Sequence, residues 1–142
     1  MTMLTPVLLL IVWTLIILVL LASRRLPSII ANAKKGIYPS KRTQELAGLP
    51  EKSIWTSDNH THLHEQPTLF YALCLYSHLV GVADNINIGL AFAYVVLRVI
   101  HSIIQTSTNN IIWRFRVFMT GTAILMIIAL RNVWALFAGY LV

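Results

Sequence analysis

The chain has 142 residues, of which 57% are hydrophobic, and its mean hydropathy is +0.72. A water-soluble domain of this size is more polar, so the composition predicts one integral membrane domain over residues 1–142. The net charge of +6 does not indicate a nucleic-acid partner, because seven of the eleven basic residues gather between Arg24 and Lys52 without interleaved exposed aromatic residues. This cluster is typical of a loop that faces anionic lipid headgroups.

Four apolar segments predict an all-α, four-helix membrane bundle. The first covers residues 4–22, close to the roughly 20 residues that cross a bilayer as a helix. Arg24, Arg25 and Pro27 follow it and are expected to end it. Basic residues after an apolar run are typical of an uncleaved first span rather than an export signal. The remaining spans are predicted at residues 68–82, with residues 62–67 as an entry turn, and at 88–104 and 117–142.

The charges of the connecting segments predict the orientation. The segment 23–58, with turns expected at Tyr38-Pro39 and Leu49-Pro50, is the longest predicted loop and carries the basic cluster. The polar segment 105–116 carries two further arginines. Short loops rich in Lys and Arg stay in the cytoplasm, so both loops are expected there and both termini on the opposite side, in a multi-pass protein of a bacterial inner membrane.

One face of the third span is polar. At 100° per residue, Tyr94, Arg98, His101 and Gln105 fall within an arc of about 60°. Ionisable groups at membrane depth cost about 2.5–3.5 kcal/mol each on insertion scales, so they usually face protein or water and often mark a functional site. We therefore expect this stripe to face away from lipid.

Glu65 at the start of the second span and Arg114 before the fourth are expected at the same membrane level as the lower end of the stripe. One interpretation is a site for a small zwitterion or anion, because arginines bind carboxylates in bidentate fashion and Glu65 can bind an ammonium. The other is structural: Arg98 and Glu65 form an ion pair between helices, and a backbone carbonyl satisfies His101.

Two further features have open alternatives. His60, His62 and His64 have the close spacing of metal ligands, but no second cluster accompanies them, so no metal is expected. Arg131, inside the fourth span, could pair across a subunit interface or extend toward the far headgroups, and a structural role is favoured over a functional one.

Three segments resemble the membrane-associated proteins in eicosanoid and glutathione metabolism, the MAPEG family. They are residues 62–70 (His-Leu-His-Glu-Gln-Pro-Thr-Leu-Phe), residues 98–101 (Arg-Val-Ile-His) with Gln105, and residues 114–118 (Arg-Phe-Arg-Val-Phe). Their order covers roughly residues 58–118, and the four-span layout extends the resemblance to the whole chain.

The resemblance implies a homotrimer that binds glutathione between subunits and receives a hydrophobic cosubstrate from the membrane lipids. Carried over by position, Glu65 would hold the ammonium of glutathione. Arg114 would lie near its sulfur as the catalytic residue. An arginine of the first loop, Arg24 or Arg25, would come from the neighbouring subunit. The pocket would be lined by His62, Arg98, His101 and Gln105.

The chain also departs from the family pattern. His62 stands where the family has asparagine, Gln105 where it often has tyrosine, and Phe115 where some prostaglandin synthases have serine. These departures disfavour prostaglandin-type isomerase chemistry. The predicted function is a glutathione transferase or peroxidase that acts on hydrophobic electrophiles or lipid hydroperoxides, and the alternative is a non-catalytic lipid-binding scaffold of the same fold.

Overall fold

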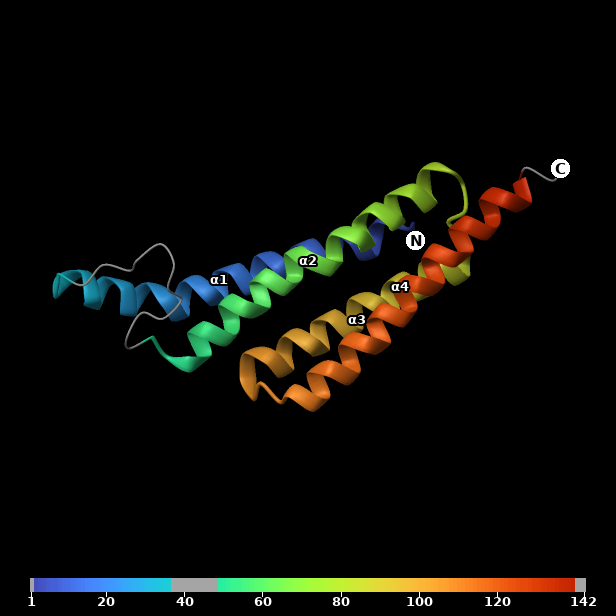
Figure 1. Cartoon of the computed structure of the whole chain (residues 1–142). Coiled ribbons are helices and arrows are strands. Elements are labelled where there is room, and N and C mark those ends of the chain that lie inside the picture. Colours follow the sequence, from blue (N-terminus) through green and yellow to red (C-terminus); the bar gives the residue numbers. More distant parts are fainter. Residues whose placement is uncertain (1, 37–48, 140–142) are drawn as a thin grey trace.

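The computed structural model describes residues 2–36 and 49–139, and these residues form four helices and no strand (Figure 1). The predicted all-α class is therefore confirmed. The helices are α1 (Leu4–Lys34), α2 (Glu51–Leu79), α3 (Asn85–Ser107) and α4 (Ile111–Gly139).

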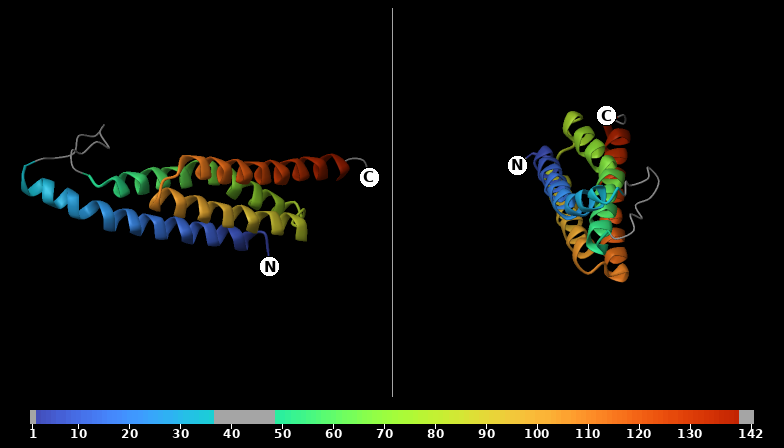
Figure 2. Two further views of the ribbon diagram at one scale, coloured as in Figure 1. Left: turned by 90° about the horizontal axis from the view of Figure 1, so that it is seen from below. Right: turned by 90° about the vertical axis from the view of Figure 1, so that its left-hand side faces the viewer.

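The helices run alternately up and down, so each lies antiparallel to the next (Figure 1). α1 packs mainly on α2, and α3 packs mainly on α4, while α2 joins the two pairs. Within the described residues α1 and α4 do not touch, and Figure 2 shows them on opposite sides of the bundle. The central position of α2 and α3 explains why most of the buried polar residues come from these two helices.

The prediction that the first helix ends at Arg24, Arg25 and Pro27 is wrong, because α1 continues to Lys34. Proline is unfavourable inside a helix because it removes one backbone hydrogen bond. Outside the bilayer, however, the carbonyl that Pro27 leaves without a partner can bind water instead. At about 1.5 Å per residue, the 31 residues of α1 are longer than a bilayer core requires. Its end extends past the rest of the bundle (Figure 2).

The predicted loops are correspondingly shorter than expected. The segment 23–58 is helical at both ends, and α2 begins directly after Leu49-Pro50, where the turn stays a prediction. The turn predicted at Tyr38-Pro39 lies outside the described residues. Likewise, the segment 105–116 is mostly helix, because α3 runs to Ser107 and α4 starts at Ile111. Arg114 is therefore a helical residue rather than a loop residue.

Three helices, α1, α3 and α4, are long and apolar enough to cross a membrane. With this composition the chain is an integral membrane protein. α2 is as long as α4 but less apolar, because its first half carries histidine and acidic residues. It also passes through Pro67, as predicted, with the proline ring buried against neighbouring helices. That α2 also crosses the bilayer, and where each span enters and leaves it, stay predictions.

A small aromatic core holds the middle of the bundle together. The rings of Phe70 on α2 and Tyr94 on α3 stack with their centroids 4.6 Å apart, and both side chains are fully buried. Gly121 on α4 lies against the Tyr94 ring, where a Cβ atom would meet ring carbons at 3.8 Å. In contrast, many large apolar residues are exposed on the outside of the bundle, among them Val19 and Leu130, as expected for contact with lipid.

Candidate functional site

The polar stripe of α3 is buried inside the bundle, as predicted. Tyr94, Arg98, His101 and Gln105 are at most 5% exposed. Each of these polar groups needs a partner from another helix, because burial without one is costly. Their partners divide the stripe into a structural part and a part that borders a groove.

Arg98 is held by a network that involves Gln66 rather than Glu65. Its Nε donates to the Tyr94 hydroxyl at 2.9 Å, and its Nη2 donates to the Gln66 side-chain oxygen. The guanidinium also lies against the ring faces of Tyr94 and Phe118, 5.4 and 5.3 Å from their centroids. The alternative of an Arg98–Glu65 ion pair is wrong for this chain, because no carboxylate within the described residues pairs with Arg98.

Gln66 is the site residue that the sequence interpretation missed. Besides Arg98, it bonds to α4, because its amide nitrogen donates to the Thr122 hydroxyl at 2.7 Å. Gln66 comes three residues after Leu63 and four before Phe70, both of which are buried. This spacing puts Gln66 on the inner face of α2 and could have identified it.

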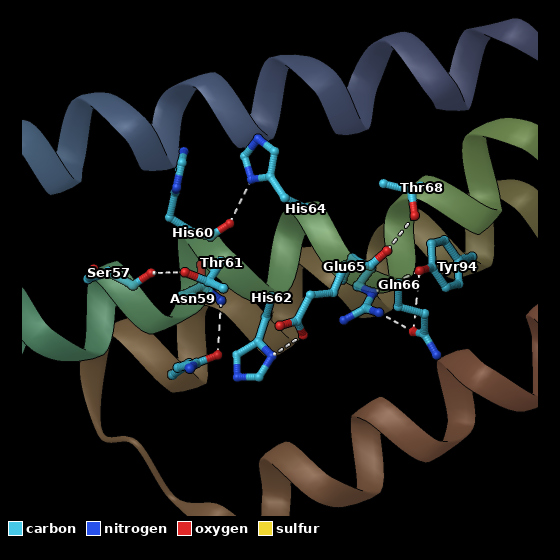
Figure 3. Close-up of polar contacts among 12 residues, drawn as sticks. Ser57, Asn59, His60, Thr61, His62, His64, Glu65, Gln66, Thr68 and Tyr94 are labelled. Atoms are coloured by element: carbon cyan, nitrogen blue, oxygen red, sulfur yellow. Dashed lines mark hydrogen bonds and ion pairs between the residues drawn. The ribbon is translucent and has the colours of Figure 1, made fainter. Parts of the chain in front are cut away.

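Glu65 is rotated by about 100° around α2 from its neighbour Gln66, so its side chain points away from the inner face of the helix (Figure 3). Its carboxylate lies 3.1 Å from Nδ1 of His62, and both side chains are more than a third exposed, 62% for Glu65 and 39% for His62. Glu65 is therefore accessible to a ligand and is oriented by His62.

A groove of about 280 Å³ brings together three of the predicted site residues, His62, His101 and Arg114. The imidazole rings of His62 and His101 approach edge to face, with centroids 6.3 Å apart. The other lining residues are apolar and come from α4: Ile111, Phe115 and Phe118. The groove thus joins one polar side, which includes Glu65 through its contact with His62, to one apolar side.

Arg114 contributes the cationic group of this groove. Its Nη1 donates to the side-chain oxygen of Asn109 at 2.5 Å. Its Nε is buried and has no hydrogen-bond partner within the described residues. Arg114 lines the groove, so its cationic guanidinium can interact there with an anionic ligand atom.

Gln105 is used inside the bundle. Its side-chain oxygen accepts a hydrogen bond from the Asn59 amide at 3.1 Å, and both residues are fully buried or nearly so. Gln105 does not line the groove formed by His62 and Arg114. This contact links α2 to α3 one turn beyond His101.

Arg24 and Arg25 differ in their contacts. Nη1 of Arg24 donates to the Thr56 hydroxyl at 2.7 Å and to the Thr106 carbonyl oxygen at 2.9 Å. Arg24 therefore joins α1 to α2 and to the last turn of α3, where a cation also complements the helix dipole. Arg25 has only a long contact with the Ser57 hydroxyl, at 3.4 Å.

The three closely spaced histidines of α2 diverge. The rings of His60 and His64 lie 4.5 Å apart and point toward α1, whereas His62 points toward Glu65 and the α4 side (Figure 3). Within the part of the chain that the structure describes, no three His, Cys, Asp or Glu residues are grouped to hold a metal ion. The arrangement does not favour a metal site.

Arg131 has partners inside the chain, in agreement with the structural role that the sequence favoured. Its Nη2 lies 2.5 Å from the Asp84 carboxylate, and its Nε donates to the Asn87 side-chain oxygen at 2.7 Å. Asp84 is the N-cap of α3, so the pair lies at the α2–α3 turn, at the opposite end of the bundle from the groove. Arg131 is a structural link between α3 and α4.

The comparisons with known proteins agree with this architecture. The family model described as the MAPEG family matches residues 3–134. Searches of curated proteins and of solved structures found no match. The match includes α1, α2 and α3, α4 as far as Trp134, and every residue of the groove, which confirms the resemblance noted in the sequence. This chain belongs to the MAPEG family of membrane proteins, whose functions lie in glutathione and eicosanoid metabolism.

Proposed function

We propose that the protein is a glutathione-dependent membrane transferase, with peroxidase activity toward lipid hydroperoxides. The observation that carries this proposal is that Arg114 lines the groove together with His62 and His101. Family membership makes glutathione the ligand to test first.

The proposed pose follows from charge. The ammonium of glutathione binds the accessible Glu65, the carboxylates and amides lie along His62 and His101, and the sulfur lies near Arg114. Arg98 lies against the ring of Phe118, which lines the groove, and Gln105 accepts a hydrogen bond from Asn59. In this proposal both residues support the groove from inside the bundle. The apolar wall of Ile111, Phe115 and Phe118 receives the hydrophobic cosubstrate.

The chemistry needs a thiolate. A free thiol has a pKa of about 8.5 and is mostly protonated at neutral pH, so a fixed guanidinium in a site of low dielectric favours its ionised form. In the transferase reaction the sulfur bonds to an electrophilic carbon, the leaving group departs with its electron pair, and the thiol proton goes to water. In the peroxidase reaction the thiolate attacks a peroxide oxygen, the O–O bond breaks and an alcohol forms. The attacked oxygen stays on the sulfur as a sulfenic acid, and the alkoxide takes a proton from water. The thiol of a second glutathione then attacks the sulfenic sulfur, which gives the disulfide and releases water.

We also propose that the protein assembles as a homotrimer and that the segments rich in Lys and Arg face the cytoplasm. Trimers are typical of the family. In a trimer, a neighbouring subunit would close the open side of the groove. The mass of the detergent-solubilised particle, measured by native mass spectrometry, tests the assembly independently of activity.

The test of function compares wild type with Arg114→Ala, and with Arg116→Ala as a matched control. Arg116 is exposed, lies against the Trp113 ring and does not line the groove. We expect wild type and Arg116→Ala to conjugate glutathione to an electrophilic model compound and Arg114→Ala to lose most of this activity. Wild-type protein without turnover and without calorimetric binding of glutathione would reject the proposal.

One observation favours the alternative of a non-catalytic lipid-binding scaffold. Gln105, which stands where the family often has tyrosine, is turned inward to Asn59 and offers no group to the groove. This alternative predicts lipid that co-purifies with the protein and no response of thermal stability to glutathione.

A further inference from the structure

Two adjacent asparagines connect α3 to α4 and have different tasks. Asn110 caps α4, because its side-chain oxygen accepts hydrogen bonds from the backbone N–H groups of Ile112 and Trp113 at 3.1 and 3.2 Å. Asn109 ends α3 in the left-handed conformation, with φ of 51°, and its backbone N–H donates to the Ile104 carbonyl at 2.8 Å. Backbone geometry alone would be satisfied by glycine at position 109.

The side chain of Asn109 adds a contact that glycine would lack. Its oxygen accepts from Nη1 of Arg114 at 2.5 Å. The left-handed turn aims this oxygen at α4, and the cap formed by Asn110 fixes the first turn of α4 that carries Arg114. The two asparagines together therefore define where the guanidinium lies.

The Asn109 side chain is a neutral amide, which affects the charge that Arg114 presents to the groove. A carboxylate at this position would hold Arg114 equally well but would offset its positive charge. The described ion pairs involve Glu65 and Asp84, and neither includes Arg114, so the carboxylate that acts on its charge is the more distant Asp58 on α2. The amide oxygen restricts a flexible side chain and leaves its charge available to an anion in the groove.

From this geometry we propose that Asn109 is a positioning residue, which directs the Arg114 guanidinium into the groove while preserving its charge for the thiolate of glutathione. The part that concerns glutathione rests on the proposed function. The part that concerns Arg114 can be measured without any ligand.

The first experiment measures the orientation of Arg114 directly. Phenylglyoxal modifies accessible guanidinium groups, and mass spectrometry of peptides gives the labelling rate of Arg114 in intact, detergent-solubilised protein. We expect Asn109→Gly, which suits the left-handed backbone, to raise this rate several-fold. Asn109→Asp should keep the rate at or below that of wild type, and so should the control Asn110→Ser, which retains the helix cap.

The second experiment measures the thiol. The thiolate absorbance of bound glutathione is titrated with pH in the same variants. We expect both Asn109→Gly and Asn109→Asp to raise the pKa of the bound thiol, the first by releasing the guanidinium and the second by offsetting its charge. The activity of Asn109→Gly should fall by roughly tenfold, the effect of one hydrogen bond to a charged group.

Asn109→Gly and Asn109→Asp therefore change the labelling rate of Arg114 differently but both raise the pKa of the bound thiol. A merely structural role for Asn109 would not produce this pattern. Wild-type labelling of Arg114 in a folded Asn109→Gly variant would overturn the inference. If wild type binds no glutathione, the proposed function fails, and the labelling rates alone decide whether Asn109 directs Arg114.

Discussion

Arg131 of α4 pairs with Asp84, the residue that caps α3, at a distance of 2.5 Å between Nη2 and the carboxylate. The two residues are 47 positions apart in the sequence. Asp84 also accepts from the backbone N–H of Asn87 at 2.7 Å, so one carboxylate both begins a helix and joins it to its neighbour. This contact determines how α4 lies against α3 at the end of the bundle remote from the groove.

The two roles of Asp84 can be separated by substitution. Asp84→Asn retains the capping oxygen and loses the ion pair, whereas Asp84→Ala loses both. We expect Asp84→Ala to reduce the free energy of unfolding by about 1 kcal/mol more than Asp84→Asn, the usual effect of a helix cap. Reversible unfolding in detergent measures the difference, and equal losses in the two variants would show that the cap contributes nothing.

Arg131→Ala should be more destabilising than an exposed ion pair would suggest. It leaves the Asn87 side-chain oxygen, which belongs to a fully buried residue, without its donor. We expect a loss of about 2 kcal/mol, in the range for an unsatisfied buried polar group. A loss below about 0.5 kcal/mol would place Arg131 among ordinary surface residues.

Substitutions at the adjacent residues Gln66 and Glu65 are expected to have opposite effects, the first on stability and the second on glutathione binding. Gln66→Leu deprives the buried Arg98 of one of its two acceptors and should lower the free energy of unfolding by about 2 kcal/mol or more. Glu65→Gln removes an exposed carboxylate and should change stability by less than about 0.5 kcal/mol. Conversely, Glu65→Gln should weaken glutathione binding in calorimetry. The reverse pattern of stability and binding would contradict the roles assigned to the two side chains.

Arg24 and Arg25 provide a second pair. Arg24→Ala removes hydrogen bonds to Thr56 and to the Thr106 carbonyl, so we expect a loss of about 1–2 kcal/mol in the free energy of unfolding. Arg25→Ala should have a smaller effect, because its contact with Ser57 is long and weak. If Arg25→Ala lowers glutathione binding without a loss of stability, Arg25 is the arginine that reaches a neighbouring subunit.

The orientation is tested by cysteine labelling in intact cells. The native Cys74 is fully buried and should give little background. Ala83→Cys lies in the α2–α3 turn and Thr108→Cys in the α3–α4 turn, at opposite ends of the bundle. We expect an impermeant thiol reagent added outside to label Ala83→Cys and not Thr108→Cys. Labelling of both from outside would contradict the four-span arrangement.

The features that depend on local periodicity could be predicted from the sequence. Four helices, and a single buried stripe on α3, follow from the 100° rotation per residue and from the cost of placing charge in lipid. The same periodicity would have identified Gln66 on the inner face of α2, although the acidic Glu65 beside it was the more conspicuous candidate. The ends of the helices were less predictable. Pro27 leaves a carbonyl of the preceding turn without its helical hydrogen bond, and the helix can continue where that carbonyl finds another partner.

Which side chains contact one another depends on how the helices pack. The partners of Arg98, Arg114 and Arg131 depend on how far each helix is shifted and rotated against its neighbours, and side-chain packing along whole helices sets these shifts. A rotation by one residue exchanges Gln66 for Glu65 opposite Arg98. Many contacts along each helix together set this packing, so no local pattern encodes it. The groove that His62, His101 and Arg114 line therefore exists only in the assembled bundle.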